Sequence, residues 1–324
     1  MSIPVISVAL CTYNSSRFVE IQLRSILSQS ILPFEIVISD DGSTDDTLNI
    51  VRVVCSKVPS VRLRVITGTE SLGVTANFER AVRACVGDLI VLCDHDDYWQ
   101  PRRIETALQG FSDDEHLLFQ HTDARLIDEV GAPLGVSLFQ ALGVSPAERE
   151  LIDSGHAFSA YLRRNVATGA TAMFRRSLLE SALPFPKEWV HDEWLAVVAS
   201  IVGRVQVLDD QLIDYRQHGR NQIGVKKPTL RYRVGRMLEP RGRRYEELAL
   251  RSRRLLERLP DLNPSESVLL LVRRKVNFEA DRSRLPRNRL ARVSRVWHHY
   301  RAGSYATLSS QGDLDVVRDL IQPA

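Results

Sequence analysis

Three aspartates follow a short apolar run in the first third of the chain. Leu89 to Cys93 are apolar, and Asp94, Asp96 and Asp97 come directly after them. Neighbouring carboxylates repel one another and raise one another's pKa, so a buried strand that ends in them needs a neutralising charge. A hard divalent cation prefers such oxygen ligands, and a cation held there could carry a diphosphate. The alternative is a solvated acidic loop that only ends the strand.

The segments around this cluster alternate between strand and helix patterns. Apolar runs predict buried strands at 5–10, 35–39, 61–66 and 89–93, with amphipathic helices between them. This alternation predicts a mostly parallel, doubly wound α/β sheet, whose ligands bind beyond the carboxyl ends of the strands. Polar residues follow three of these strand ends: Thr12, Tyr13 and Asn14, then Asp40 and Asp41, then 94–97. We therefore expect three polar clusters on one rim.

The composition is that of an ordinary globular protein. The 324 residues are 44% hydrophobic and 26% charged, and no apolar run approaches the roughly 20 residues of a membrane-spanning helix. The N-terminus lacks the pattern of a secretory signal, and the four cysteines are widely spaced. These features predict a cytoplasmic protein with reduced cysteines.

Charge is distributed unevenly along the chain. Residues 226–324 carry 23 Lys and Arg against 11 Asp and Glu, a net charge of +12, whereas residues 1–225 carry −9. We interpret 1–225 as a catalytic domain, with halves of about 1–110 and 111–225, and 226–324 as a basic helical region. Such a region can face phosphate or an anionic membrane. The alternative is a set of helical faces solvated by arginines.

The rim lacks the usual dinucleotide and triphosphate loops. Neither G-x-G-x-x-G after the first strand nor G-x-x-x-x-G-K-[ST] is present. The second loop instead offers a carboxylate, which can accept a hydrogen bond from N3–H of uracil or thymine but not from cytosine. A pyrimidine nucleoside diphosphate carried on a divalent metal fits all three clusters.

Four segments together resemble a known family. Leu10 to Asn14, Gln29, Glu35 to Thr47 and Cys93 to Trp99 are similar to the motifs of family 2 glycosyltransferases of the GT-A fold. The resemblance is dense over about the first 100 residues and sparser to about residue 225. It implies a glycosyltransferase that uses a nucleoside diphosphate sugar with Mn²⁺ or Mg²⁺.

The resemblance also implies roles for residues on the rim. Thr12, Tyr13 and Asn14 would line the nucleotide pocket, and Asp41 would read the base. The D-x-D region would hold ribose and metal, with Asp94 and Asp97 toward the nucleotide and Asp94 and Asp96 toward the metal.

The second half of the chain offers a candidate base. Asp192 opens a predicted helix that begins near His191, and an Asp there is often only a cap or a dipole partner. The resemblance implies that Asp192 takes the proton of the acceptor hydroxyl during a single, inverting displacement.

Further candidates lie around this helix and after it. His218 is a candidate metal ligand, although a lone histidine is more often structural. The candidates for contact with diphosphate or acceptor are Arg216, Arg220, Gly169 and Trp194.

The segment Tyr215 to His218 and the basic C-terminal helices resemble bacterial rhamnosyltransferases. This resemblance implies dTDP-L-rhamnose as donor, a lipid-linked glycan as acceptor, a product such as O-antigen, and peripheral contact with the cytoplasmic face of the inner membrane. UDP-hexose donors remain open, and we expect no nucleic-acid partner. The rival functions are a nucleotidyltransferase, which would need a glycine- and basic-rich loop after the first strand, and a non-catalytic binding protein.

Overall fold

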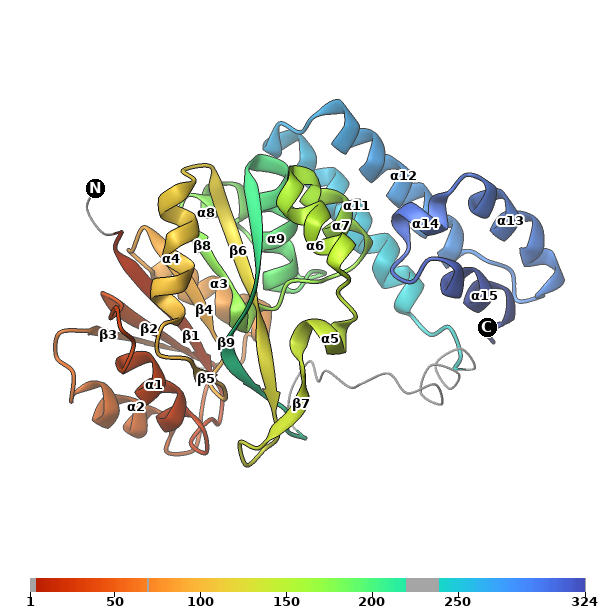
Figure 1. Ribbon diagram of the computed structural model, residues 1–324. Coiled ribbons are helices and arrows are strands. Elements are labelled where there is room, and N and C mark those ends of the chain that lie inside the picture. Colours follow the sequence, from red (N-terminus) through yellow and green to blue (C-terminus); the bar gives the residue numbers. More distant parts are fainter. Residues whose placement is uncertain (1–3, 69, 220–238, 324) are drawn as a thin grey trace. The chain divides into compact units, whose positions relative to one another are not determined.

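The computed structural model describes residues 4–68, 70–219 and 239–323, which divide into two compact units (Figure 1). The first unit comprises residues up to 157 together with 166–226, and the second comprises 158–165 and residues from 227 onward. The predicted helix around Leu230 and the candidate Arg220 lie outside the described residues.

The first unit is built on one mixed sheet. Its strands, in the order β3-β2-β1-β4-β8-β6-β9-β5 with β7 added to β6, are β1 (Ile6–Thr12), β2 (Glu35–Asp40), β3 (Arg62–Thr67), β4 (Leu89–Cys93), β5 (Tyr98–Trp99), β6 (Leu117–Ile127), β7 (Pro133–Ser137), β8 (Met173–Arg175) and β9 (Arg204–Arg216). The four strands β1 to β4 pair in parallel, as the sequence predicted. The added half is mixed: β8 is antiparallel to β4 and β6, whereas β9 is parallel to β6.

Strand β9 is longer than the sequence indicated. The apolar run predicted a strand over Val205 to Leu208 only, but β9 continues to Arg216. It continues because it pairs along β6 and, at Ile213 and Asp214, with β5. The segment that precedes His218 therefore ends beside the acidic loop.

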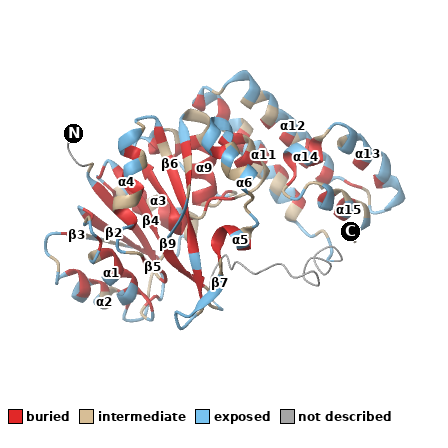
Figure 2. Ribbon diagram, viewed as in Figure 1, coloured by how far each residue is buried: buried red, intermediate tan, exposed pale blue. Residues whose placement is uncertain are grey.

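Helices pack on both faces of this sheet (Figure 1). The helices of the first unit are α1 (Val19–Leu27), α2 (Thr47–Cys55), α3 (Val74–Ala84), α4 (Arg103–Asp113), α5 (Leu138–Leu142), α6 (Pro146–Leu151), α8 (Leu178–Ala182) and α9 (His191–Val202). Strands β1, β2 and β4 are buried along their whole length (Figure 2). Their apolar side chains account for the continuous apolar runs in the sequence.

The second unit is helical. Its helices are α7 (Ala157–Arg163), which begins at the last residue of the first unit, and α11 (Arg244–Leu262), α12 (Glu266–Ser283), α13 (Val293–Arg301), α14 (Ser304–Leu308) and α15 (Asp313–Ile321). Proline usually ends a helix, but α11 continues past Pro260 to Leu262. The buried Leu259 and Leu262 hold this last turn in the core of the unit.

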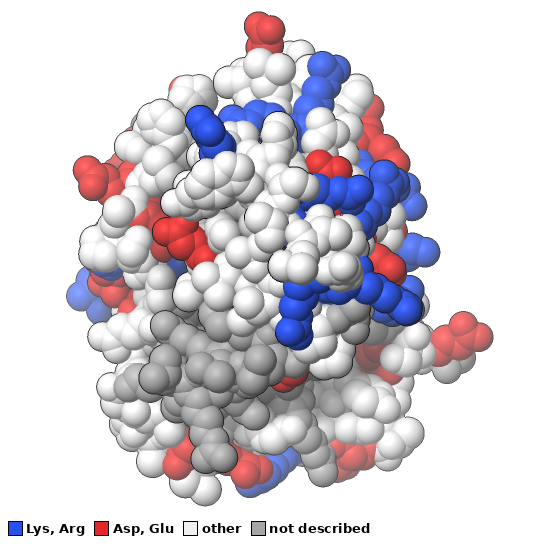
Figure 3. Space-filling model, turned by 90° about the vertical axis from the view of Figure 1, so that its right-hand side faces the viewer, with Lys and Arg blue, Asp and Glu red and all other residues white. Residues whose placement is uncertain are grey.

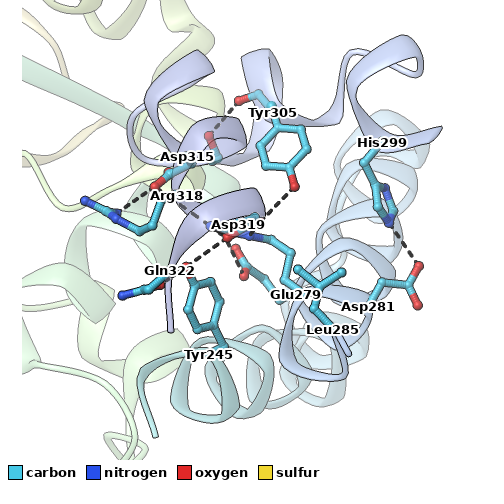
Figure 4. Close-up of polar contacts among 12 residues, drawn as sticks. Tyr245, Glu279, Asp281, Leu285, His299, Tyr305, Asp315, Arg318, Asp319 and Gln322 are labelled. Carbon is cyan, nitrogen blue, oxygen red and sulfur yellow. Dashed lines mark hydrogen bonds and ion pairs between the residues drawn. The ribbon is translucent and has the colours of Figure 1, made fainter. Parts of the chain in front are cut away.

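A buried ionic network lies between α12 and α15 (Figure 4). Arg282 donates to Asp319 at 2.7 Å and contacts Glu279 at 3.4 Å, and Lys275 pairs with Glu279 at 2.8 Å. These side chains are at most 8% exposed.

Among the described residues, no helix is both long and apolar enough to span a membrane.

Candidate functional site

The acidic loop lies at the carboxyl edge of the parallel strands. Thr12 is aligned with Asp40 across β1 and β2, and Leu10 is aligned with Cys93 across β1 and β4. The loop from Asp94 to Asp97 therefore follows its strand at the edge where the loops after β1 and β2 also begin. The three polar clusters share one rim because neighbouring parallel strands end together.

Two carboxylates of this loop are electrostatically unfavourable as ions. Burial, then Asp96 and Asp192, raise the pKa of Asp94 to about 7. Burial and the other two carboxylates of the loop raise the pKa of Asp97 well above its usual range. One oxygen of Asp97 accepts from the backbone N–H of Arg216 at 2.9 Å, but Oδ2 is buried with no hydrogen-bond partner among the residues that the structure describes.

His218 meets the acidic loop across 122 positions of sequence. Its Nε2 lies 2.7 Å from Oδ2 of Asp96, and both side chains are less than 10% exposed. The imidazole also stacks on Phe18 at 5.2 Å between ring centroids. The structure thus brings together His218 and Asp96, two of the three side chains that the sequence named as candidate metal ligands, from distant segments.

Arg216 lies behind the loop and is 5% exposed. Its guanidinium donates to the backbone carbonyl of Asp96 at 2.8 Å, and to those of Asp128 and Glu129 at 3.3 and 3.2 Å. The same group lies over the ring of Phe18, 5.0 Å from its centroid. Arg216, expected at the diphosphate, is therefore engaged in holding the shape of the acidic loop.

The residues present fit a divalent cation. The described residues contain no group of three His, Cys, Asp or Glu side chains already arranged to hold a metal. Metals such as Mg²⁺, however, are often bound through one or two carboxylates, with substrate phosphates and water as the other ligands. Asp94 and Asp96 would supply carboxylate oxygens and His218 an imidazole nitrogen. The unpartnered oxygen of Asp97 shows that the loop has acceptor capacity to spare.

The loop after β1 presents an exposed tyrosine. Thr12 is 1% exposed and donates to Asp40 at 2.7 Å, so it fastens β1 to β2. Tyr13 is 56% exposed. Asn14 has a left-handed backbone, with φ of 46°, and its side chain accepts from the N–H of Thr44 at 2.8 Å. Of the three predicted pocket residues, Tyr13 is free to stack on a ligand, and the other two shape the loop.

Asp41 already accepts several hydrogen bonds. The N–H of Leu72 donates to Oδ1 at 2.7 Å, and the hydroxyl of Ser71 and the N–H of Gly73 donate to Oδ2 at 2.7 and 3.0 Å. Asp41 is 6% exposed. It therefore orders the segment 71–73, and only its remaining lone pairs could receive a base N–H.

Asp192 is held within the first turn of α9. The N–H of Gly169 donates to Oδ2 at 2.7 Å, and the N–H of Glu193 donates to Oδ1 at 2.7 Å. The residue that caps the helix is Val190, so Asp192 is not the cap. Asp192 contributes to the raised pKa of Asp94, which places the base candidate near the acidic loop.

Gly169 packs against the first turn of α9, beside Asp192, whereas Trp194 lies in the core. A Cβ at Gly169 would lie 2.9 Å from Nε2 of His191 and 3.4 Å from Oδ2 of Asp192, so glycine is needed for close packing on α9. Trp194 is fully buried, and its indole N–H donates to the carbonyl of Ala182 at 2.7 Å. Its side chain therefore belongs to the core.

Sequence reasoning missed two arginines near the rim. Arg103 is 2% exposed, lies 3.7 Å over Trp99, donates to the carbonyl of Ala170 and lowers the pKa of Asp94. Arg80 donates to Ser39 and to the carbonyl of Asp40 at 2.7 and 2.6 Å. The sequence could have indicated the burial of Arg103, because it precedes the apolar Ala107 and Phe111 by one and two helical turns and so lies on the apolar side of the helix.

The sheet order, the acidic loop after β4 and the rim that they form define a GT-A type fold. Residues 7–183, more than half of the chain, match the sequence profile of Glycosyl transferase family 2. The chain belongs to this family.

Individual relatives agree with this assignment. An uncharacterized glycosyltransferase of Nostoc sp. is 25% identical over 67% of this chain and 66% of its own length. Chondroitin synthase of Escherichia coli is 35% identical over 40% of this chain, which corresponds to 18% of the synthase. The chain thus spans less than two thirds of these relatives.

Two solved structures share the fold at low sequence identity. The mannosyltransferase PcManGT of Pyrobaculum calidifontis, in complex with GDP-Man and Mn²⁺, is 18% identical, with a TM-score of 0.55 over 98% of this chain and 86% of that one. TarS of S. aureus, in complex with UDP-GlcNAc, has the same identity and TM-score over 98% of this chain and 81% of that one.

Proposed function

We propose that this protein is a metal-dependent, inverting glycosyltransferase that transfers L-rhamnose from dTDP-L-rhamnose to a lipid-linked glycan in bacterial surface polysaccharide synthesis. One observation carries the proposal. A carboxylate held in a fixed orientation, Asp192, lies near the acidic loop, although about 100 residues of sequence separate them. An inverting transfer needs this pairing, because the base and the leaving group must act on one sugar. We propose that the transfer takes place at the cytoplasmic face of the inner membrane.

The proposed reaction is a single displacement. The acceptor oxygen attacks the anomeric carbon, the bond from that carbon to the diphosphate oxygen breaks, and Asp192 receives the hydroxyl proton. The N–H groups of Gly169 and Glu193 hold the two carboxylate oxygens so that one face can meet the acceptor. A divalent cation, when bound by the acidic loop, neutralises charge on the diphosphate. Arg216 maintains the loop that receives it.

The proposed donor rests on recognition of the pyrimidine ring and on the resemblance of the segment Tyr215 to His218 to rhamnosyltransferases. Asp41, through its remaining lone pairs, would accept N3–H of thymine, and the same contact is available to uracil. A UDP-hexose is therefore the second candidate donor, and the UDP-GlcNAc complex of TarS, which has the same fold, favours keeping it in the test.

Calorimetric titration with dTDP, UDP and GDP, each with Mn²⁺ and with EDTA, tests the donor. The proposal expects metal-dependent binding in the order dTDP, then UDP, with GDP weakest. Tighter binding of UDP would move the donor to a UDP-hexose. Preference for GDP would remove the base-reading role of Asp41.

Replacement of the proposed base tests the transfer itself. Asp192→Asn should lower the turnover of dTDP-rhamnose by about 10²–10⁴-fold, which is the usual contribution of a general base. Metal-dependent dTDP binding should stay within about twofold, because the amide keeps the acceptor for the N–H of Gly169. The matched control is Asp210→Asn, which changes an exposed carboxylate on β9. Full turnover by Asp192→Asn would refute the role of this residue.

A further inference from the structure

Helix α13 carries an exposed apolar stripe. The stripe is formed by Leu290, Val293, Trp297 and Tyr300, which are 83%, 51%, 56% and 46% exposed. Val293, Trp297 and Tyr300, spaced by four and three residues, lie on one side of α13, and Leu290 precedes them in the 3-10 turn that leads into the helix. The rings of Trp297 and Tyr300 stack with centroids 5.6 Å apart, so they form one continuous surface. A contiguous exposed patch of this kind marks an interaction site more often than scattered single residues do.

The adjoining side of the same segment is fixed to the second unit. Val296 is 3% exposed, and the guanidinium of Arg292 donates to the carbonyls of Gln322 and Pro286 at 2.7 and 2.6 Å. His299 contacts Asp281 at 3.0 Å. The helix is therefore held in place along this side, and the apolar stripe next to it faces solvent.

Positive charge surrounds the stripe. Residues 282–312 contain seven arginines and not one Asp or Glu. Five of these arginines are exposed, namely Arg284, Arg287, Arg289, Arg295 and Arg301. Basic side chains gather on part of the surface seen from the right-hand side of Figure 1 (Figure 3). The apolar stripe and the arginines around it are together complementary to a partner that has an apolar interior beneath an anionic surface.

We propose that the α13 surface, defined as the apolar stripe with these five arginines, docks the protein on an anionic lipid bilayer. Trp and Tyr favour the boundary between headgroups and acyl chains, where leucine and valine side chains can also leave water. Arginines beside them meet anionic headgroups, each contributing a few-fold in affinity. The proposal concerns the second unit alone, so it deepens the proposed membrane location without depending on the transfer reaction.

The α13 surface differs from the surface that the sequence suggested. The sequence indicated the basic C-terminal helices as a group, with basic residues between the apolar positions of the segments that form α11 and α12. In the structure, Arg254 pairs with Glu257 at 2.7 Å and Arg258 with Asp261 at 3.3 Å. Exposed acids thus offset the positive charge of α11, whereas the segment around α13 has none between 282 and 312.

The tryptophans of the chain provide a direct assay. Trp99, Trp189 and Trp194 are at most 6% exposed, so Trp297 is the one tryptophan with a large exposed surface. On vesicles of phosphatidylcholine with about 30% phosphatidylglycerol, tryptophan emission should shift to the blue, and brominated acyl chains should quench it. Trp297→Phe should still bind the vesicles but lose both signals. Binding without a shift would place the contact elsewhere and overturn the proposal.

Paired variants separate the α13 surface from the rest of the unit. Trp297→Ser with Tyr300→Ser should lower vesicle affinity at least tenfold in co-sedimentation, and Arg289→Gln with Arg301→Gln should lower it about tenfold, with a weaker salt dependence. The matched controls are Leu250→Ser, at a residue of α11 that is 43% exposed, and Arg253→Gln with Arg254→Gln. These should bind as the wild type does. Loss of binding in the controls alone would assign the membrane contact to α11 instead.

Two further outcomes would refute the α13 surface as a membrane site. One is equal affinity for anionic and neutral vesicles, and the other is no affinity for either. If wild-type protein dimerises in solution and the Trp297→Ser, Tyr300→Ser variant is monomeric, the stripe is a contact between copies. Turnover with a soluble acceptor should be unchanged in every variant of the α13 surface and in the α11 controls. A loss of turnover confined to Asp192→Asn would therefore leave the membrane proposal standing, and the reverse pattern would leave the transfer standing.

Discussion

Each of the two units buries a cluster of charged side chains, but the clusters are balanced differently. In the second unit, Lys275, Arg282 and Arg318 face Glu279, Asp315 and Asp319, three charges of each sign. Figure 4 shows Glu279, Asp315, Arg318 and Asp319 of this set. Two tyrosine hydroxyls, of Tyr245 and Tyr305, donate to the remaining lone pairs of Asp319 at 2.8 and 2.7 Å. This network is complete within the unit, so its members need no ligand.

The acidic loop of the first unit is incomplete. Among the described residues, the ion pairs of its three aspartates are limited to the contact of Asp96 with His218. The buried Arg103 lowers the pKa of Asp97, but among the described residues it forms no ion pair with the three aspartates. Oδ2 of Asp97 has no hydrogen-bond partner among these residues. Buried charges are costly unless paired. The comparison teaches that a paired buried cluster stabilises a fold, whereas an unpaired one prepares a binding site.

Breaking the balanced network should produce the largest effect. Arg282→Met leaves Asp319 and Glu279 buried without their principal counter-charge, so the free energy of unfolding should fall by about 3–5 kcal/mol. Urea denaturation measures this loss, and the turnover per folded molecule should remain that of the wild type. A change below about 1 kcal/mol would mean that the network contributes little to stability.

Removing a charge from the acidic loop should lower turnover and leave stability unchanged, the reverse of the effect of Arg282→Met. Asp96→Asn should lower turnover by about 10²-fold or more, equivalent to about 2.7 kcal/mol or more of transition-state stabilisation. The midpoint of thermal unfolding in EDTA should not decrease, because the substitution relieves repulsion with Asp94 and Asp97. Mn²⁺ should stabilise the wild type and not the variant. A strongly destabilised Asp96→Asn protein would show that this carboxylate is structural.

A neutral buried group sharpens the comparison with a smaller effect. His191 stacks on Phe78 at 3.9 Å, and neither ring nitrogen has a hydrogen-bond partner in the described part of the chain. Burial lowers the pKa of His191 to about 3. The unfolded chain takes up this proton near pH 6.5 and the folded chain does not, so stability falls as the pH falls from 6.5 toward 3. The contribution is about 1.4 kcal/mol per pH unit.

Denaturation of His191→Leu at several pH values measures this contribution. The dependence of unfolding free energy on pH should be shallower than in the wild type between pH 6 and 4. The difference between the two proteins should be constant above about pH 7.5, where this histidine is neutral in both states. Parallel curves over the whole range would exclude a contribution from His191.

Local patterns were sufficient to predict one part of the molecule. The four parallel strands, the helices between them and the acidic loop could be predicted because each βαβ step uses residues close in sequence and only one handedness. The rim followed from the same rule, since adjacent parallel strands end together. The family resemblance added candidate roles for Asp41 and Asp192, which remain proposals.

Tertiary structure decided which side chains reach the rim and which support it. Only the pairing of β9 with β6 and β5 brings His218 to Asp96 and turns Arg216 toward the backbone of the loop. Trp194, adjacent in sequence to the acidic first turn of α9, points into the core. Spacing in sequence cannot predict these outcomes, because they depend on the face that each element buries against segments 20 to 120 residues away.

The same division holds for the second unit. The sequence determined its net positive charge and its helical character. The packed structure decided which arginines are neutralised by neighbours and which apolar residues stay in solvent, so the exposed stripe lies on α13 and not on α11, which has more arginines. Charge and helical period are local properties of a chain, whereas exposure is a property of the whole packed unit.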